Sequence, residues 1–126
     1  MSLLNPAHID CPTPFRIADA LAQLEQRYTN PHLQLSSLAT DVELSPAYLA
    51  RLLKASTGLT FLQHLRRHRV EHAERLLLRT MMSIKEIGAE CGYNSSGSFG
   101  RDFRRVHRCT PGAWRATHRT GAHRTN

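Results

Sequence analysis

Apolar residues recur along this chain three and four positions apart, which is the spacing of one face of an α-helix. No segment alternates between apolar and polar residues over the length of a β-strand. The spacing therefore predicts an all-α fold with about seven helices. We expect them at about 14–28, 37–41, 46–57, 61–79, 84–92 and 95–107, with a short last helix from about 110.

Capping residues mark the ends of several of these helices. Ser45 and Thr110 each precede a proline, a pair typical of an N-cap followed by the first helical position. Ser83 and Glu86 have the spacing of a capping box, in which each side chain bonds the backbone N–H of the other residue. Gly58 stands where the third helix should end in a left-handed residue.

The chain contains a weak copy of itself about fifty residues along. Segment 45–54 recurs as 95–104, with arginine on arginine and large apolar residues on large apolar residues. Upstream the offset is one residue smaller, so the second copy has one extra residue in its turn. The repeat predicts two homeodomain-like helix-turn-helix subdomains, at about 36–58 and 83–108.

A long helix at 61–79 is expected to join the two subdomains. Its 19 residues would span roughly 28 Å. Successive major-groove faces on one side of DNA lie about 34 Å apart. We therefore expect a single chain to place one helix in each of two adjacent major grooves.

The outward faces of the two second helices hold the candidate DNA-contacting residues. Arginine can bond a guanine edge through two hydrogen bonds, so Arg51 and Arg101 are the leading candidates for base contacts. Their predicted neighbours on the same faces are Pro46, Ala47, Ala50, Ser96, Gly97 and Gly100. The basic residues one turn further on are placed for phosphate contacts, and they are Lys54, Arg104 and Arg105.

Charge is distributed unevenly along the chain. Residues 1–62 hold four Lys and Arg against five Asp and Glu, whereas residues 63–126 hold thirteen against five. A basic half of this kind suits double-stranded DNA or an anionic membrane surface. No segment has the length of a membrane span and no signal peptide is present, while three scattered cysteines indicate a reducing compartment. We expect a cytoplasmic protein.

Catalytic and metal chemistry are weakly represented. No Ser-His-Asp arrangement, phosphate loop or carboxylate pair falls on neighbouring predicted elements, so we expect no enzyme activity and no cofactor. His64, His68 and His72 recur every four residues and form a weak candidate metal site. The alternative, which we favour, is a solvated polar helix face, because no carboxylate or cysteine completes a ligand set.

The motifs together resemble the DNA-binding domain of the AraC/XylS transcription regulators. The resemblance covers about residues 17–119, within a DNA-binding domain that we place at 14–119. It is carried by Leu-Ser-Pro-x-Tyr-Leu-x-Arg-Leu-Leu-Lys at 44–54, Gly-Leu-Thr-Phe at 58–61, Ile-x-Glu-Ile-Gly at 84–88, Cys-Gly-Tyr at 91–93, Phe-x-Arg-x-Phe-Arg-Arg at 99–105 and Thr-Pro-x-x-Trp-Arg at 110–115.

This resemblance implies a bacterial, sequence-specific DNA-binding transcription regulator, most often an activator that contacts RNA polymerase and is nucleoid-associated when bound. Relatives usually add a ligand-sensing domain, and only about 16 residues precede the match here. We therefore expect no small-molecule ligand domain in this chain, which is similar to the stand-alone stress-response activators of the family or to an excised domain.

Some residues depart from the family pattern. Arg108 stands where glycine is usual, so the end of its helix could differ. Gly97 and Gly100 weaken the second candidate helix and offer it no side-chain contacts. These small residues keep open an alternative function, a protein-interaction module or anti-activator that retains the fold without contacting DNA. Outside the domain we expect a loose arm at 1–13 and a disordered tail at 120–126.

Overall fold

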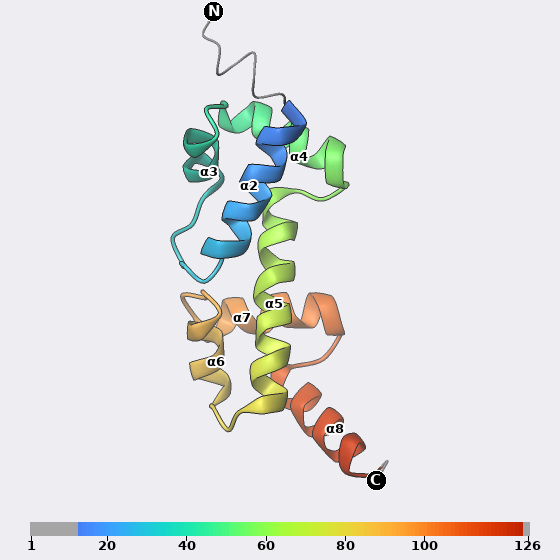
Figure 1. Cartoon of the computed structure of the whole chain (residues 1–126). Helices are drawn as coiled ribbons and strands as arrows, with labels where there is room; N and C mark the ends of the chain where they lie inside the picture. Colours follow the sequence, from blue (N-terminus) through green and yellow to red (C-terminus); the bar gives the residue numbers. More distant parts are fainter. Residues whose placement is uncertain (1–12, 125–126) are drawn as a thin grey trace, which may run out of the picture. The chain divides into compact units, whose positions relative to one another are not determined.

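The computed structural model describes residues 13–124, and these form seven helices without a β-strand (Figure 1). The predicted all-α fold is therefore confirmed. The helices are α2 (Thr13–Arg27), α3 (Leu35–Asp41), α4 (Pro46–Thr57), α5 (Phe61–Arg79), α6 (Ile84–Glu90), α7 (Ser96–His107) and α8 (Pro111–Arg124).

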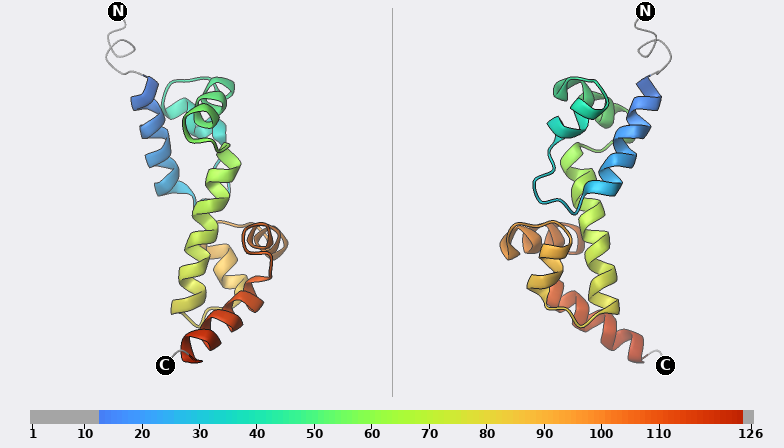
Figure 2. Two further views of the ribbon diagram at one scale, coloured as in Figure 1. Left: turned by 90° about the vertical axis from the view of Figure 1, so that its right-hand side faces the viewer. Right: turned by 60° about the vertical axis from the view of Figure 1, so that its left-hand side comes forward.

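The described chain divides into two compact units. Unit one contains α2, α3, α4 and residues 61–64 of α5, and unit two contains residues 28–31, the rest of α5, α6, α7 and α8. In unit one the three helices α2, α3 and α4 pack against one another (Figure 2). Their contacts bury a core of aliphatic side chains, which includes Ile17, Leu24, Leu38, Leu49 and Leu53.

Unit two has a core of its own, built around aromatic rings. The ring centroids of Phe99 and Phe103 lie 5.9 Å apart, and those of Phe103 and Trp114 lie 5.7 Å apart, both in edge-on geometry. Such edge-on pairs are favourable beyond the area that they bury. The remaining buried members of this core are Val70, Ala73, Leu77, Ile87, Cys91 and Tyr93. Burial raises the pKa of the Cys91 thiol to about 12, so this cysteine is a packing residue.

The sequence repeat is also a structural repeat. Each position from 51 to 64 has the same burial class as the position fifty residues later. The turns correspond too, because Leu44 N–H donates to the Ala39 carbonyl at 2.9 Å and Tyr93 N–H donates to the Gly88 carbonyl at 3.0 Å. The extra residue of the second copy therefore lies between Tyr93 and the cap of α7, and it is Asn94.

The predicted helix caps are present in both units. The side chains of Ser45 and Ser95 accept the backbone N–H of Tyr48 and Ser98, respectively, each at 3.1 Å. Ser83 caps α6 in the predicted capping box with Glu86. The hydrogen bonds of this box lower the pKa of the Glu86 carboxyl group. Local capping chemistry thus sets the start of α4, α6 and α7.

Two helices end in the same left-handed geometry although their residues differ. Gly58 ends α4 with φ 80°, and its N–H donates to the Lys54 carbonyl at 2.9 Å. Arg108 ends α7 with φ 63°, and its N–H donates to the Arg104 carbonyl at 2.8 Å. The end of α7 therefore has the same geometry as the end of α4, and Arg108 adopts a conformation that favours glycine.

Several sequence-based expectations were wrong. Helix α8 continues through Arg124, where a disordered tail was expected from residue 120, because a capped helix that has begun propagates through polar residues more easily than it nucleates. Leu62 and Val106 are apolar residues within their helices, yet they are 64% and 46% exposed. Val106 occupies the position of the exposed Ser56 in the repeat. The predicted arm at 1–13 lies outside the described residues up to residue 12, and Thr13 already belongs to α2.

Candidate nucleic-acid interface

The first candidate surface is the solvent-facing side of α4. Pro46, Ala47, Arg51 and Lys54 are exposed and Ala50 is half-buried. They share this side because Leu49 and Leu53 turn the opposite side into the core of unit one. The amine of Lys54 donates to the Gly58 carbonyl at 3.0 Å, so it lies at the end of the helix. The surface combines one arginine with small residues that leave the helix backbone accessible.

An aromatic ring supports the arginine of this surface. The guanidinium carbon of Arg51 lies 5.5 Å from the ring centroid of Tyr48, within the range of a cation–π contact. Tyr48 is itself 39% exposed. The contact restricts the freedom of Arg51 while leaving its hydrogen-bond donors available to a ligand. Sequence reasoning did not identify Tyr48 as a site residue.

The second candidate surface is the equivalent side of α7. Ser96, Gly97, Arg101, Arg104 and Arg105 are exposed and Gly100 is half-buried. Phe99 and Phe103 hold the opposite side in the core of unit two. Arg101 donates from Nη2 to the Ser98 hydroxyl at 3.3 Å, so its side chain bends back along the first turn of its own helix. The predicted contact residues are thus exposed except for Ala50 and Gly100, which are half-buried, and the structure does not test what they bind.

A polar network anchors α7 to α5 directly beside Arg101. Asp102 accepts a hydrogen bond from Arg66 Nε at 3.3 Å and another from the Tyr93 hydroxyl at 3.0 Å. Burial and the neighbouring Asp102 raise the pKa of Tyr93 above its ordinary value, so the hydroxyl remains a donor. In unit one the corresponding positions hold two half-buried leucines, Leu44 and Leu52. The second unit therefore uses polar contacts where the first uses apolar ones.

Arg69 extends this network to the segment that precedes α3. Its guanidinium lies over the Tyr93 ring, with 5.4 Å from its carbon to the ring centroid. Nε donates to the Tyr28 carbonyl at 2.8 Å and Nη2 to the Asn30 carbonyl at 3.0 Å. Burial lowers the pKa of Arg69, and the side chain keeps its charge because the ordinary value is far above neutral pH.

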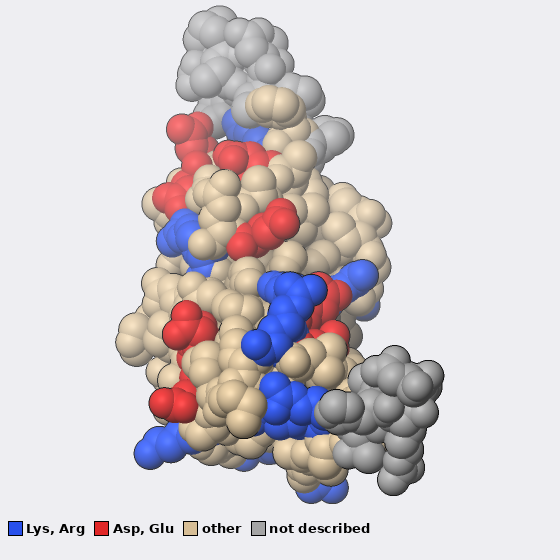
Figure 3. All heavy atoms as spheres, turned by 60° about the horizontal axis from the view of Figure 1, so that its bottom comes forward, with Lys and Arg blue, Asp and Glu red and all other residues tan. Residues whose placement is uncertain are grey.

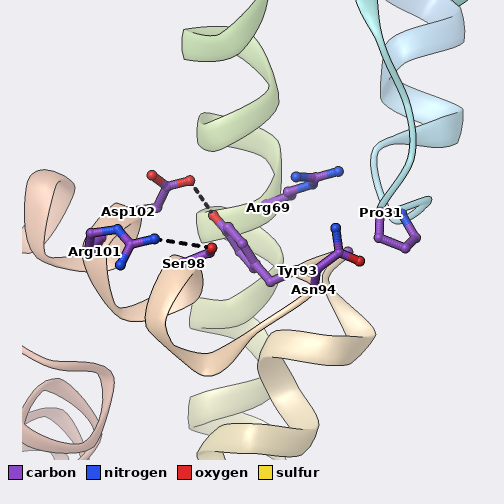
Figure 4. Close-up of a pocket in the computed structure, with 8 residues that line it drawn as sticks. Pro31, Arg69, Tyr93, Asn94, Ser98, Arg101 and Asp102 are labelled. Atoms are coloured by element: carbon purple, nitrogen blue, oxygen red, sulfur yellow. Dashed lines mark hydrogen bonds between the residues drawn. The ribbon is translucent and has the colours of Figure 1, made fainter.

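A pocket of about 260 Å³ lies beside the first turn of α7 within unit two. Figure 4 shows Arg101 and Ser98 on one side of Tyr93, and Asn94 and Pro31 on the other. The guanidinium of Arg69 points toward the Pro31 segment (Figure 4). The lining residues are Pro31, Arg69, Gly92, Tyr93, Asn94, Ser98, Arg101 and Asp102. One candidate DNA-contacting residue, Arg101, therefore also forms part of a pocket wall.

The three histidines of α5 have separate packing roles rather than forming the solvated face that we expected. His64 is buried, and its Nε2 lies 2.7 Å from the Thr57 hydroxyl. His68 stacks on Tyr28 with ring centroids 5.4 Å apart, and His72 Nδ1 lies 3.2 Å from the Tyr28 hydroxyl. Among residues 13–124, no three His, Cys, Asp or Glu side chains form a group suited to a metal ion.

Sequence reasoning missed residues whose roles depend on distant partners. His64 stands at the repeat position of the buried Trp114, so the repeat itself contained a signal for its burial. The contact between Asp102 and Arg66 joins positions 36 residues apart, and no local pattern indicates it. Asn94 could have been identified as the extra turn residue by aligning the caps of the two copies.

The surface charge follows the uneven distribution along the sequence. On the face drawn in Figure 3, Lys and Arg side chains gather mainly in the middle and lower parts of the view. Within the described part of the chain, no helix is both long enough and apolar enough to cross a membrane. An exposed basic surface of this kind attracts polyanions.

Comparisons with known proteins agree with the geometry. A family model described as a helix-turn-helix domain matches residues 38–117. The arabinose operon regulatory protein of Salmonella typhimurium is 28% identical over 116 residues, which is 92% of this chain and 41% of that protein. The chain thus spans less than half the length of this curated relative.

Two solved structures are similar over most of their length. The C-terminal domain of AraT, a response regulator from Geobacillus stearothermophilus, is 30% identical with a TM-score of 0.78, covering 81% of this chain and 84% of that one. The DNA-binding domain of AdpA, a global transcriptional factor solved in complex with a target DNA, is 28% identical with a TM-score of 0.78. That similarity covers 83% of this chain and 94% of the other.

Proposed function

The chain belongs to the AraC/XylS family of helix-turn-helix transcription regulators, and on that premise we propose that it binds specific DNA sequences and regulates transcription. One observation carries the proposal. The exposed sides of α4 and α7 correspond position by position and present Arg51 and Arg101 at equivalent places. The domain of AdpA, which has the same fold, was solved on a target DNA.

In this proposal α4 enters a major groove through its exposed side. Arg51 donates two hydrogen bonds to a guanine edge, while the Tyr48 ring limits the directions that the guanidinium can take. Pro46, Ala47 and Ala50 allow the helix backbone to approach the bases, and an alanine methyl group can contact the methyl group of thymine. Lys54, one turn further along, bonds a phosphate.

Helix α7 makes the equivalent contacts with fewer side chains. Arg101 is its base-contacting residue, Ser96 offers a hydroxyl group, and Arg104 and Arg105 contact phosphates. Gly97 and Gly100 contribute no side chain to the interface. We therefore expect unit two to add affinity and comparatively little base selectivity.

Further roles come from the family. RhaR, a relative from Salmonella arizonae that is 35% identical over 81 residues, is named a transcriptional activator. We propose the same direction of regulation here, through contact with RNA polymerase, and a location in the cytoplasm at the nucleoid. A binding role of this kind requires neither catalysis nor a cofactor.

A selection from random duplex DNA tests the proposal directly. The full chain is incubated with the library at about 0.15 M salt, where unspecific phosphate contacts are weakened, and the bound molecules are sequenced. We expect enriched short boxes that contain a guanine contacted by Arg51. A folded chain that enriches no sequence would contradict sequence-specific binding.

Arginine variants connect the selected DNA to the proposed residues. Each good bidentate base contact is worth about 1–3 kcal/mol, so Arg51→Ala with Arg101→Ala should weaken binding by about a hundredfold. Arg79→Ala removes an exposed arginine at the end of α5 and serves as the control. If the double variant and the control bind the boxes equally well, the alternative of a protein-interaction module would be favoured.

A further inference from the structure

We propose that the pocket beside the first turn of α7 binds one oxyanion of the phosphate class, and that a backbone phosphate of the bound duplex supplies it. The inference rests on the proposed DNA binding and adds Asn94 and Ser98 to the residues that perform it. A free phosphate compound would offer the same chemistry from a different source. The two sources are separated by the tests below.

The charged groups of the pocket favour an anion. Two guanidinium groups, of Arg69 and Arg101, line it together with one carboxylate, that of Asp102. The oxygens of Asp102 already accept hydrogen bonds from Arg66 and Tyr93, so the carboxylate is partly neutralised inside the network. An oxyanion therefore meets a net positive site.

Hydrogen-bond donors are present on the same walls. The Arg101 guanidinium has five N–H donors, of which one is directed to the Ser98 hydroxyl at 3.3 Å. The side-chain amide of Asn94 and the hydroxyl of Ser98 supply further donors. Ser98 lies in the first turn of α7, a helix of 12 residues, where the backbone dipole adds positive potential.

The size of the pocket suits a chemical group rather than a whole ligand. Pockets for complete small molecules have volumes of about 300–1,000 Å³, whereas this one has about 260 Å³. A phosphate with part of its sugar is a group of the right kind. A pocket of this size on the proposed contact surface can therefore receive one unit of a nucleic-acid backbone.

The bound phosphate would also position Arg101. A guanine edge takes two of the five donors of an arginine, which leaves others for a second partner. When the phosphate bonds one edge of the Arg101 guanidinium, the other edge is held in position to contact the base. Asn94 is the extra residue of the second copy, so unit one has no equivalent of this arrangement.

A charge placed in the pocket gives the first test. Asn94→Asp preserves the size of an exposed side chain but sets a carboxylate against the phosphate, and we expect at least a tenfold loss of affinity for the selected DNA. Gln26→Glu makes the same change of net charge at an exposed position of α2 and should change affinity less than twofold. Equal effects of the two variants would overturn the proposal.

Neutral phosphate analogues give the second test. Single methylphosphonates are scanned along the selected DNA, with the original chain and with Asn94→Ala. At one position we expect the methylphosphonate to reduce the DNA affinity of the original chain about tenfold. The affinity of Asn94→Ala should fall clearly less there, because this variant already lacks the side chain that bonds the phosphate. If every position affects both proteins equally, DNA does not supply the oxyanion.

Inorganic phosphate separates the two sources. It is titrated against chloride at constant ionic strength while NMR follows the Asn94 amide and the Arg101 Nε–H signals. Saturable shifts that Asn94→Asp abolishes, without any methylphosphonate coupling, would assign the pocket to a free phosphate compound. The absence of both the shifts and the coupling would overturn the pocket proposal. Shifts in a chain that selects no DNA would overturn the proposed function and the DNA backbone as the source, and would leave an oxyanion site for a free phosphate compound.

Discussion

At the scale of single residues, the clearest feature is a non-glycine residue in a conformation that favours glycine. Arg108 ends α7 with φ 63°, where Gly58 ends α4 with φ 80°. An L-residue is disfavoured in this region by about 1 kcal/mol. Replacing such a residue with glycine removes this cost. The greater flexibility of glycine in the unfolded chain offsets part of the gain in stability.

Arg108→Gly should therefore stabilise the protein, by about 0.5 kcal/mol in the free energy of unfolding. Gly58→Ala is the opposite control and should destabilise by about 1 kcal/mol. A Cβ at Gly58 would meet no atom within 4 Å, so this control isolates the backbone effect. Denaturant titrations measure both changes. A loss of stability in Arg108→Gly would show that the arginine side chain makes a compensating contact.

A second residue-scale prediction concerns His72. Burial, followed by the charge of Arg75, lowers the pKa of His72 in the folded protein, against a weaker opposite effect of Glu90. The unfolded chain therefore binds a proton more readily than the folded one. The stabilisation from neutral His72 is present above its ordinary pKa of 6.5 and is lost as the pH falls through the lowered folded value.

His72→Gln removes this titration while keeping a group that can accept from Tyr28. Between about pH 7.5 and pH 5.5 the original chain should lose more stability than the variant. Urea titrations at the two pH values supply the comparison, in which the other histidines contribute equally to both proteins. The same pH dependence in both would show that His72 is not perturbed in the folded state.

At the scale of helices and turns, the two copies solve one packing problem in two ways. A Cβ on Gly88 would lie 2.9 Å from Phe99 Cδ2, which is too close for the present packing. The same two positions in unit one hold Ala39 and Leu49, both fully buried. The larger ring of unit two thus faces a residue without a side chain.

A double-mutant cycle tests this compensation. Gly88→Ala should destabilise by about 1–3 kcal/mol through overpacking, and Phe99→Leu should destabilise by leaving a cavity. The double variant recreates the unit-one pair and should lose less than the sum, with a coupling of at least about 1 kcal/mol. Additive losses in thermal or urea unfolding would indicate that the two positions pack independently.

Helix α7 is expected to be less protected than α4. Its Gly97 and Gly100 each weaken a helix by about 1 kcal/mol relative to alanine. A Cβ at Gly100 would meet nothing within 4 Å, and one at Gly97 would make only ordinary contact. Gly97→Ala with Gly100→Ala should therefore slow amide exchange across residues 96–105. If the amides of residues 96–105 already exchange as slowly as those of residues 46–56 in the original chain, the two glycines do not weaken α7.

Local signals explain how much of these elements could be predicted from the sequence. Ser45, Ser83 and Gly58 fixed helix ends through contacts within a few residues, so those ends were predicted closely. The burial of His64 and the stacking of His68 on Tyr28 depend on which partner each residue meets in the folded unit. Such partners lie beyond the periodicity of a single helix, and the predictions failed there.

At the scale of the whole molecule, the proposed function predicts a steep response to salt. Each neutralised phosphate contributes about −0.9 to the slope of log affinity against log salt. Arg104→Ala with Arg105→Ala should therefore flatten the slope by about 2. Lys85→Ala, at an exposed position of α6, should leave it unchanged. Equal slopes for both variants would show that Arg104 and Arg105 do not contact phosphates.

The candidate site could also be located from the sequence, but not its supporting contacts. The repeat alone placed Arg51 and Arg101 on equivalent exposed faces, because a repeated pattern fixes which side of each helix is buried. The network of Asp102, Tyr93 and Arg69 joins α7, the turn after α6, and α5, and Arg69 continues it to Tyr28. Most of these contacts connect residues far apart in sequence. Only the folded chain brings those groups together.

The matched burial of residues 51–64 and 101–114 gives each exposed position of α4 from Arg51 onward an exposed equivalent on α7. Substitutions at these exposed positions of α7, chosen from their equivalents in α4, should leave the buried residues of unit two unchanged. Such a hybrid would carry the same specificity twice and would favour a direct repeat of one recognition sequence. The repeat thus offers a way to change the operator preference with surface substitutions alone.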